Sequence, residues 1–178
     1  MSSVDRGDPA GGVVAAPGGR VWLRPQTAAD APFLFALFHG RMGAMLAPAG
    51  LAPEALESII ASQYQLRGLD YRAKFPRARW SVVEAEDGPI GELIEHDEPD
   101  AVYIVDMTLL PARQAQGIGG ALVRALMTAN AARGGVRAIA LASNENSLKM
   151  FRKLGFAAAH EVGDAYFSLR WRPPAATA

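Results

Sequence analysis

The sequence predicts a mixed α+β fold, in which helices flank one central, mixed but mostly antiparallel sheet. The chain has 178 residues, and 50% of them are hydrophobic, which is enough for one domain with a sizeable core. Three runs of strand character follow one another over residues 80–110, and a helix and a further strand follow over residues 118–142. We therefore expect a single domain over residues 20–172, between a disordered leader at 1–19 and a frayed tail at 173–178.

Two helices are expected before the sheet runs. A short strand at 20–24 is followed by Thr27-x-x-Asp30, a spacing typical of a capping box at a helix start, and Gly40 is expected to end this first helix. Apolar residues then keep a helical period over 53–68, with proline in the first position. The stretch between the helices, 39–52, is apolar for a loop, so we expect it to cover a site.

The remaining elements should form an antiparallel meander, a strand–helix–strand unit and a closing pair of strands. Asp87-Gly88 supplies one hairpin turn of the meander. The expected elements are strands at 80–85, 90–95 and 102–110, a helix at 118–133, a strand at 137–142, a helix at 145–154, and strands at 156–160 and 165–171.

Composition limits the classes of function. Lysine plus arginine and aspartate plus glutamate number 18 each, which argues against a dominant surface for nucleic acid or an anionic membrane. The absence of cysteine excludes disulfides, thiolate metal sites and a cysteine nucleophile. No apolar run in the first twenty residues is long enough for a signal-peptide core, so we expect a cytoplasmic protein.

The segment from Gln114 to Gly120 is the most informative motif. It follows the apolar run 101–110 and opens an alanine- and leucine-rich helical stretch. Glycines allow a tight turn and a close approach to a ligand, and the first N–H groups of a helix lack internal partners. The segment therefore predicts a cradle for a phosphate group, whereas its structural alternative is an ordinary turn before a helix.

Two common nucleotide motifs do not fit this segment. A dinucleotide fingerprint needs a small residue where Leu122 stands, and a Walker loop needs Gly-Lys-Ser/Thr, which is absent. The remaining pattern is Gln114-x-x-Gly117-x-Gly119. Two further features accompany it: the strand before it ends in Leu-Leu-Pro at Pro111, and residues 144–156 run from an asparagine to a Gly-Phe pair. In these features the chain resembles the GCN5-related N-acetyltransferases (GNAT), whose fold it is then expected to share.

The resemblance implies acetyl-coenzyme A (acetyl-CoA) as co-substrate. In the family, backbone N–H groups of this loop hold the pyrophosphate, and the preceding strand pairs with the pantetheine arm. The matching donor-site residues are Met107, Leu109, Gln114, Gln116, Gly117, Ile118, Gly119, Gly120, Asn144 and Phe151. The backbone N–H of Leu109 matches the group that polarises the thioester carbonyl, while Asn144 has a helix cap as its structural alternative.

Phe151 departs from the family pattern. Many members have a tyrosine there as the general acid, and phenylalanine cannot donate a proton, so its aromatic packing predicts a core position. Tyr103 is a candidate substitute, although a packed ring is its plainer interpretation. Tyr64, Tyr71, Ser147 and water are further candidates, and the thiolate can also leave unaided.

Asp106 is the first candidate for a base or an anchor of a cationic acceptor, because it interrupts an apolar central strand where an unpaired carboxylate is costly. Its structural alternative is a partner for a buried arginine. Strict alternation puts it on one face with Ile104 and Thr108. Glu92 on the neighbouring strand is the second candidate, whereas Glu95 is expected to be a solvated strand-edge charge.

These residues together predict an acyltransferase that moves an acetyl group from acetyl-CoA to a small-molecule amine, by direct attack in a ternary complex. The alternative is a non-catalytic module that binds or senses acyl-CoA, which Phe151 favours. No metal site is expected, because the three histidines lack ligand spacing. Neither nucleic acid nor a membrane is expected as partner, and a homodimer is compatible with the sequence.

Overall fold

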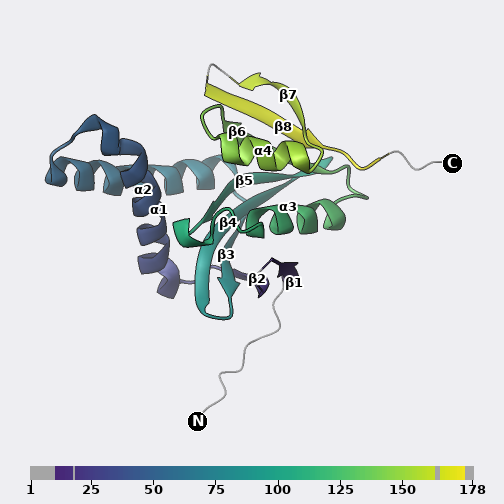
Figure 1. Ribbon diagram of the computed structural model, residues 1–178, viewed down its shortest axis with the longest axis horizontal. Coiled ribbons are helices and arrows are strands. Elements are labelled where there is room, and N and C mark those ends of the chain that lie inside the picture. The colour runs from purple at the N-terminus through teal and green to yellow at the C-terminus, as the bar shows by residue number, and fades with distance from the viewer. Residues whose placement is uncertain (1–10, 18, 163–164, 175–178) are drawn as a thin grey trace, which may run out of the picture.

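A computed structural model describes residues 11–17, 19–162 and 165–174. The described residues form one eight-stranded sheet in the order β1-β2-β3-β4-β5-β6-β8-β7 (Figure 1). All neighbouring strands are antiparallel except β5 and β6, which are parallel. The mixed, mostly antiparallel sheet flanked by helices confirms the expected fold class.

Two helices precede a three-stranded meander, and a strand–helix–strand unit, a further helix and a closing pair of strands follow. The strands are β1 (Gly11–Ala16), β2 (Gly19–Pro25), β3 (Arg79–Ala85), β4 (Gly88–Glu98), β5 (Ala101–Leu109), β6 (Val136–Leu141), β7 (Ala157–Val162) and β8 (Tyr166–Trp171). The α-helices are α1 (Ala31–Leu46), α2 (Pro53–Lys74), α3 (Ile118–Ala129) and α4 (Glu145–Lys153), and short 3-10 turns are η1 (Ala28–Asp30), η2 (Ala47–Ala49) and η3 (Pro111–Arg113). No helix among the described residues is long and apolar enough to cross a membrane.

Each face of the sheet has its own core. Leu122, Leu148 and Phe151 from α3 and α4 pack with the strand residues of one face, including Leu93 and Ile104. The buried residues of α1 and α2 lie outside that cluster and cover the other face (Figure 1). The sheet therefore separates a face covered by α3 and α4 from a face covered by α1 and α2.

The expected loop at 39–52 is wrong in its first half, because α1 continues through Gly40 to Leu46 and η2 follows. No atom lies within 4 Å of a Cβ built on Gly40 or Gly43, so nothing at either glycine forces the chain to turn. Packing of Leu37 and Phe38 against the sheet outweighs the weak helix propensity of glycine.

Helix α3 ends at Ala129, four residues before its expected end. The Asn130 side chain donates to the carbonyl of Leu126 at 2.9 Å and ends the helix there. The chain then turns through Gly134 and Gly135, which both have φ of +115°. A Cβ on Gly135 would lie 2.1 Å from the carbonyl oxygen of Trp171, so this close approach of β8 requires glycine.

Part of the segment expected as a disordered leader forms strand β1, which pairs with β2. Pro17 of the following turn lies beside the glycine loop, where a Cβ on Gly117 would be 3.0 Å from its Cγ. Residues 1–10 of the expected leader and 175–178 of the expected tail lie outside the described residues.

A buried carboxylate joins the start of the helical layer to the sheet. Asp30 accepts two hydrogen bonds from Arg24 of β2, at 2.8 and 2.6 Å, and one from the backbone N–H of Thr27, which confirms the expected capping box. The bonds from Arg24 hold the pKa of Asp30 far below its ordinary value, and those from Thr27 lower it further.

Because folding lowers this pKa, the contact stabilises the protein above about pH 4 and is lost as the pH falls below that value. We expect Asp30→Asn to lower the free energy of unfolding at neutral pH and to make it less dependent on pH between about 4 and 2. Urea unfolding across this range checks the prediction. Asp70→Asn, which changes an exposed pair with Lys74, is the control and should change the free energy of unfolding by less than about 1 kcal/mol.

Candidate active site

A β-bulge in β5 determines which side chains face α2. Ile94 pairs with Asp106, but the next residue of β4, Glu95, pairs with Ile104, so Val105 is the extra residue. The bulge shifts the alternation of side chains between the two faces of the sheet by one residue, so Asp106 shares its face with Tyr103 and Thr108. The expectation that it shares a face with Ile104 is wrong, because Ile104 packs in the core below α3.

Arg67 of α2 joins the two candidate carboxylates. Its guanidinium donates to Asp106 Oδ2 from Nε at 3.1 Å and from Nη2 at 2.8 Å, and it also forms an ion pair with Glu92. All three side chains are at least nine-tenths buried, at 10%, 10% and 7% exposure. Asp106 thus has a buried arginine as its partner, as expected if its role is structural.

The cluster has further polar contacts. The side chain of Gln26 donates to Glu92 Oε1 at 2.8 Å, and Thr108 Oγ1 lies 3.4 Å from Asp106 Oδ1. Burial lowers the pKa of Arg67, but the nearby carboxylates of Asp106 and Glu92 raise it further, so it lies above the ordinary value. Arg67 is therefore a permanent cation.

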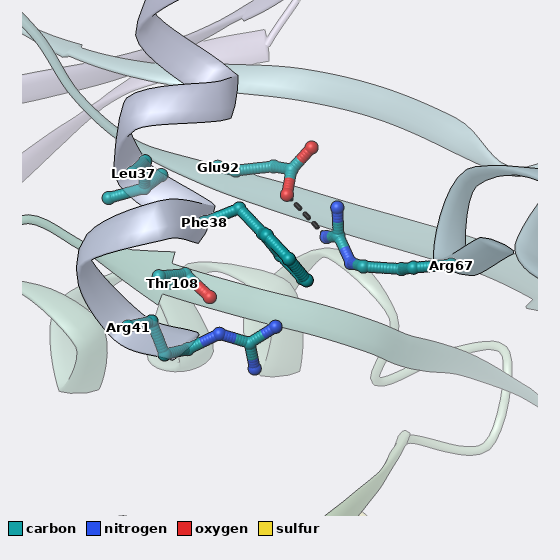
Figure 2. Close-up of a pocket in the computed structure, with 6 residues that line it drawn as sticks. All are labelled: Leu37, Phe38, Arg41, Arg67, Glu92 and Thr108. Atoms are coloured by element: carbon teal, nitrogen blue, oxygen red, sulfur yellow. Dashed lines mark hydrogen bonds and ion pairs between the residues drawn. The ribbon is translucent and has the colours of Figure 1, made fainter. Parts of the chain in front are cut away.

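A pocket lies next to this cluster, between α1 and the two central strands (Figure 2). The Phe38 ring contacts two guanidinium groups, with its centroid 5.4 Å from Arg41 Cζ and 5.7 Å from Arg67 Cζ. Arg41 is half-exposed and lies 3.8 Å from Asp106. The pocket thus combines an apolar wall with two cations and one anion, Glu92, while Asp106 lies beside it. The lining residues are Leu37, Phe38, Arg41, Arg67, Glu92 and Thr108.

On its other edge, strand β5 is paired over only part of its length. The parallel pairing with β6 comprises residues 102–104 and ends there, whereas β5 continues to Leu109. The pairing with β4 persists to Leu109, opposite Gly91. Main-chain groups of residues 105–109, including those of Met107 and Leu109, therefore face an edge that is outside the β6 ladder. Such an edge can pair with an extended ligand.

The glycine loop follows directly and has the conformation of a cradle. Ala115 and Gly117 have positive φ, +57° and +81°, and Gly117 is the N-cap residue of α3 without a side-chain cap. The first bond of the helix runs from the N–H of Ala121 to the carbonyl of Gly117, so the N–H groups of Ile118, Gly119 and Gly120 precede the ladder. The positive end of the helix dipole lies at the same point.

The two glutamines of the motif stabilise the loop. Gln114 Nε2 donates to the carbonyl of Leu109 at 2.9 Å, and Gln116 Nε2 donates to that of Ala112 at 2.6 Å. The first contact ties the loop to the end of β5. The cradle and the open edge of β5 are thereby held in a fixed relation.

Gly119 faces side chains from both sides of this edge. A Cβ built on it would lie 3.5 Å from Met107 Cε, 3.5 Å from Met150 Sδ and 4.0 Å from Leu109 Cδ1. These are ordinary contacts, so one methyl group fits. A larger side chain would extend into the space between the cradle and β5.

Asn144 and Phe151 have structural contacts. Asn144 Oδ1 accepts from the backbone N–H of Ser147 at 3.1 Å and caps α4. Phe151 is buried in the core, with its ring centroid 4.9 Å from that of Phe156. The predicted core position of Phe151 is confirmed.

Tyr103 and Tyr71 lie on the α2 face. The Tyr103 ring packs 5.5 Å from Phe75, and Tyr71 packs beneath the Arg67 guanidinium at 5.1 Å. Burial raises the pKa of both phenols, so both retain a proton that can be donated at neutral pH.

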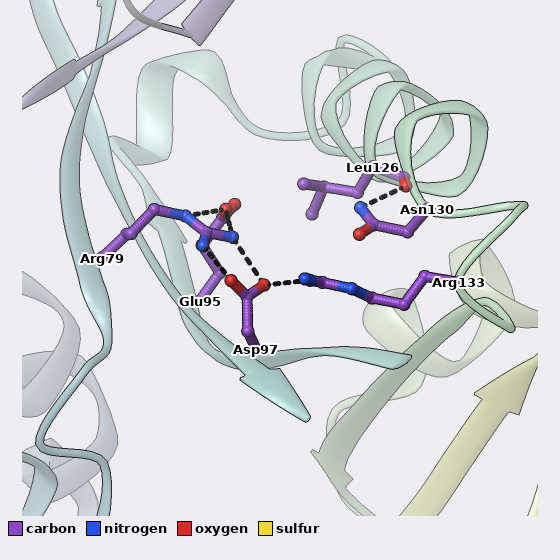
Figure 3. Close-up of polar contacts among 6 residues, drawn as sticks. All are labelled: Arg79, Glu95, Asp97, Leu126, Asn130 and Arg133. Atoms are coloured by element: carbon purple, nitrogen blue, oxygen red, sulfur yellow. Dashed lines mark hydrogen bonds and ion pairs between the residues drawn. The ribbon is translucent and has the colours of Figure 1, made fainter. Parts of the chain in front are cut away.

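Glu95, expected to be solvated, is buried at 7% exposure. It accepts two hydrogen bonds from Arg79, which also binds Asp97, and Asp97 binds Arg133 beyond α3 (Figure 3). The expectation was wrong because Arg79 of β3 compensates the buried charge of Glu95. This network lies on the α3 face, away from Asp106.

Arg67 and Gln26 are site residues that sequence reasoning missed. A signal for Arg67 exists, because it interrupts the inward stripe of α2 formed by Ile60, Tyr64 and Tyr71. No sequence signal indicates Gln26, which reaches Glu92 across 66 positions of the chain. In the part of the chain that the structure describes, no group of three or more His, Cys, Asp or Glu residues could hold a metal.

Known proteins share this architecture. The family model described as "Acetyltransferase (GNAT) family" matches residues 52–156, more than half of the chain. No protein in the curated set matches the chain.

Three solved structures have the same fold at low sequence identity. The PaiA N-acetyltransferase of Thermoplasma acidophilum, in complex with coenzyme A, is 16% identical, with a TM-score of 0.63 and coverage of 85% of this chain and 98% of its own. Mycobacterium smegmatis RimJ, in complex with CoA-disulfide, is 21% identical, with a TM-score of 0.63 and coverage of 90% and 86%. A GNAT family acetyltransferase from Listeria monocytogenes is 15% identical, with a TM-score of 0.61 and coverage of 90% and 99%. With the expected sequence features and the family match in agreement, the chain belongs to the GNAT acetyltransferase family.

Proposed function

We propose that this protein transfers an acetyl group from acetyl-CoA to the amino group of a small molecule. The observation that carries the proposal is the position of β5 between two features. Its partly unpaired edge leads to the glycine cradle, and its α2 face contributes Thr108 to the polar pocket and Asp106 to the Arg67 cluster beside it. Donor and acceptor can therefore meet across one strand, as direct attack requires.

The donor would be held mainly by backbone groups. The N–H groups of Ile118, Gly119 and Gly120 suit a pyrophosphate, because they precede the helix ladder at the positive end of α3. The open main chain of β5 at Met107 and Leu109 suits the amide groups of a pantetheine arm. Two structures of the same fold, PaiA in complex with coenzyme A and RimJ in complex with CoA-disulfide, support a donor of the coenzyme A type.

The acceptor would enter beside α1. An uncharged amine attacks the thioester carbonyl, so a C–N bond forms, the C–S bond breaks and the amine loses a proton. Asp106 is the first candidate for accepting this proton, directly or through water, since Thr108 lies beside its Oδ1 while Arg67 binds Oδ2. Glu92 is the second candidate, and Tyr103 is the candidate proton donor to the departing thiolate.

Phe151 favours a second candidate function, a module that binds or senses acyl-CoA without turnover. The buried ring at this position has no hydroxyl group for the thiolate. Calorimetry with coenzyme A, followed by measurement of thiol release from acetyl-CoA with a panel of small amines and of peptides with free N-termini, separates the functions. Thiol release with small amines supports the proposal. Thiol release with peptides only would indicate a protein acceptor, and coenzyme A binding without any thiol release would support the sensing module.

Asp106→Asn should lower kcat by about 100-fold if the carboxylate accepts the proton, the usual contribution of a general base. Coenzyme A affinity should change little, because the cradle is built from other residues. Asp97→Asn, at a half-exposed carboxylate of the network around Arg79, is the matched control. An unchanged rate in Asp106→Asn would leave this residue with a purely structural role.

A further inference from the structure

Helix α2 has a second apolar stripe, on the side opposite the active-site cluster. Its inward side carries Ile60 and Arg67. Its outward side exposes Ile59 at 38%, Leu66 at 57% and Leu69 at 68%. Exposure of three large aliphatic side chains in line on one helix is unusual for an unpartnered surface.

The stripe has the spacing of a helix–helix seam. The positions alternate in steps of four and three, as the a and d positions of a heptad repeat do. They are Ala55, Ile59, Ser62, Leu66, Leu69 and Ala73, all exposed. Alanines at both ends allow close approach, and the large aliphatic side chains lie between them, so the stripe suits one partner helix along its length.

We propose that this stripe pairs with the same stripe of a second copy, in an antiparallel arrangement about a twofold axis near residue 64. In that register Ala55 faces Ala73 of the other copy, Ile59 faces Leu69, and Ser62 faces Leu66. Each large aliphatic side chain meets an apolar or small residue. The stripe is thus complementary to itself when reversed, as an isologous interface must be.

The charges of α2 also favour the antiparallel direction. The first turn carries Glu54, and the last turn carries Arg72 and Lys74. Reversal brings the acidic end of one helix to the basic end of the other, and it opposes the two helix dipoles. Next to the twofold axis, a residue that flanks the stripe lies close to the same residue of the other copy. The residues at these positions are Gln63 and Gln65, which are neutral, so no like charges meet there.

The paired helices would also support the active site. Arg67 lies on the same turns of α2 as Leu66 and Leu69, but its side chain points to the sheet. There it binds Asp106 and Glu92. Contact along the outer stripe restricts movement of α2 relative to the sheet. Figure 1 shows that α2 extends beyond the sheet on one side, where a partner helix would add contacts that the sheet does not supply.

Light scattering of the full chain over a range of concentrations tests the dimer. The chain should have twice the mass of one copy, and Leu66→Glu with Leu69→Glu should raise the dissociation constant by about 100-fold or more, since two charges enter the apolar centre of the seam. Tyr166→Glu, at a residue of β8 that is 43% exposed, is the control and should leave the dimer intact. A monomeric wild-type chain at high concentration, or a dimer unaffected by the double change, would refute the interface.

Crosslinking tests the direction of the helices. Because the chain has no cysteine, one introduced thiol reports one position. With a short bifunctional maleimide, Gln65→Cys should crosslink to its own copy near the axis, whereas Ser58→Cys and Arg72→Cys should not. Equal crosslinking at all three positions would indicate parallel helices and overturn the proposal, and so would its absence at position 65.

Discussion

Replacing Arg67 with leucine should lower the free energy of unfolding by about 3 to 5 kcal/mol, the usual effect of removing one partner from a buried ion cluster. Arg67 is the cation that binds both Glu92 and Asp106, and all three side chains are at most 10% exposed. Without it, two carboxylates remain in the same buried site, with Gln26 and Thr108 as their nearest neutral contacts. Urea unfolding at neutral pH measures the effect.

Two further variants separate lost charge compensation from lost packing. Adding Glu92→Gln and Asp106→Asn to Arg67→Leu should recover part of the stability, because the uncompensated charges are then gone. Arg133→Leu removes an exposed arginine that binds Asp97, so it should change the free energy of unfolding by less than about 1 kcal/mol. If Arg67→Leu proved as mild as Arg133→Leu, the cluster would not hold α2 to the sheet.

Replacing Gly119 with valine should weaken coenzyme A binding by about 100-fold while the protein stays folded. The Cβ atom fits, with its nearest neighbours at 3.5 Å, but the two γ-methyl groups would occupy space between the cradle and β5. Calorimetry with coenzyme A gives the affinity, and thermal unfolding reports the integrity of the fold.

Gly119→Ala and Gly43→Val complete this test. The alanine variant adds only the methyl group that the structure accommodates, so its affinity should fall much less. Gly43→Val makes the same change in a helix where no atom lies within 4 Å of the added Cβ, and it should not affect binding. Equal affinities of wild type and Gly119→Val would show that the ligand does not approach this loop.

Local sequence patterns predicted most of the elements and the glycine turn before α3. The capping box at Thr27 and Asp30, the hairpin turn at Asp87 and the glycine turn before α3 depend on backbone preferences within a few residues, so they are readable from neighbours in the chain. Helix ends were less accurate. No residue near Gly40 in the sequence reveals that α1 continues beyond it to Leu46.

The acceptor side of the site was predictable only in part. Asp106 was recognisable as a charge in an apolar strand, but its direction depends on the bulge at Val105, which is a property of the pairing between β4 and β5. Glu95 illustrates the same limit, because its charge is compensated by Arg79 of another strand.

The sequence by itself determined the mixed fold through its hydrophobic periodicity, and it indicated the family through a resemblance in the glycine loop and the 144–156 segment. The place of the donor cradle stays a prediction, which depends on short-range backbone preferences. Only the tertiary structure decided that Asp106 and Glu92 share Arg67 and that α2 exposes an apolar stripe on its outer side. Those features join residues 25 and 39 positions apart, or depend on which side of a helix the sheet covers. Burial and charge pairing depend on which residues are neighbours in space, and the order of residues along the chain does not reveal these neighbours.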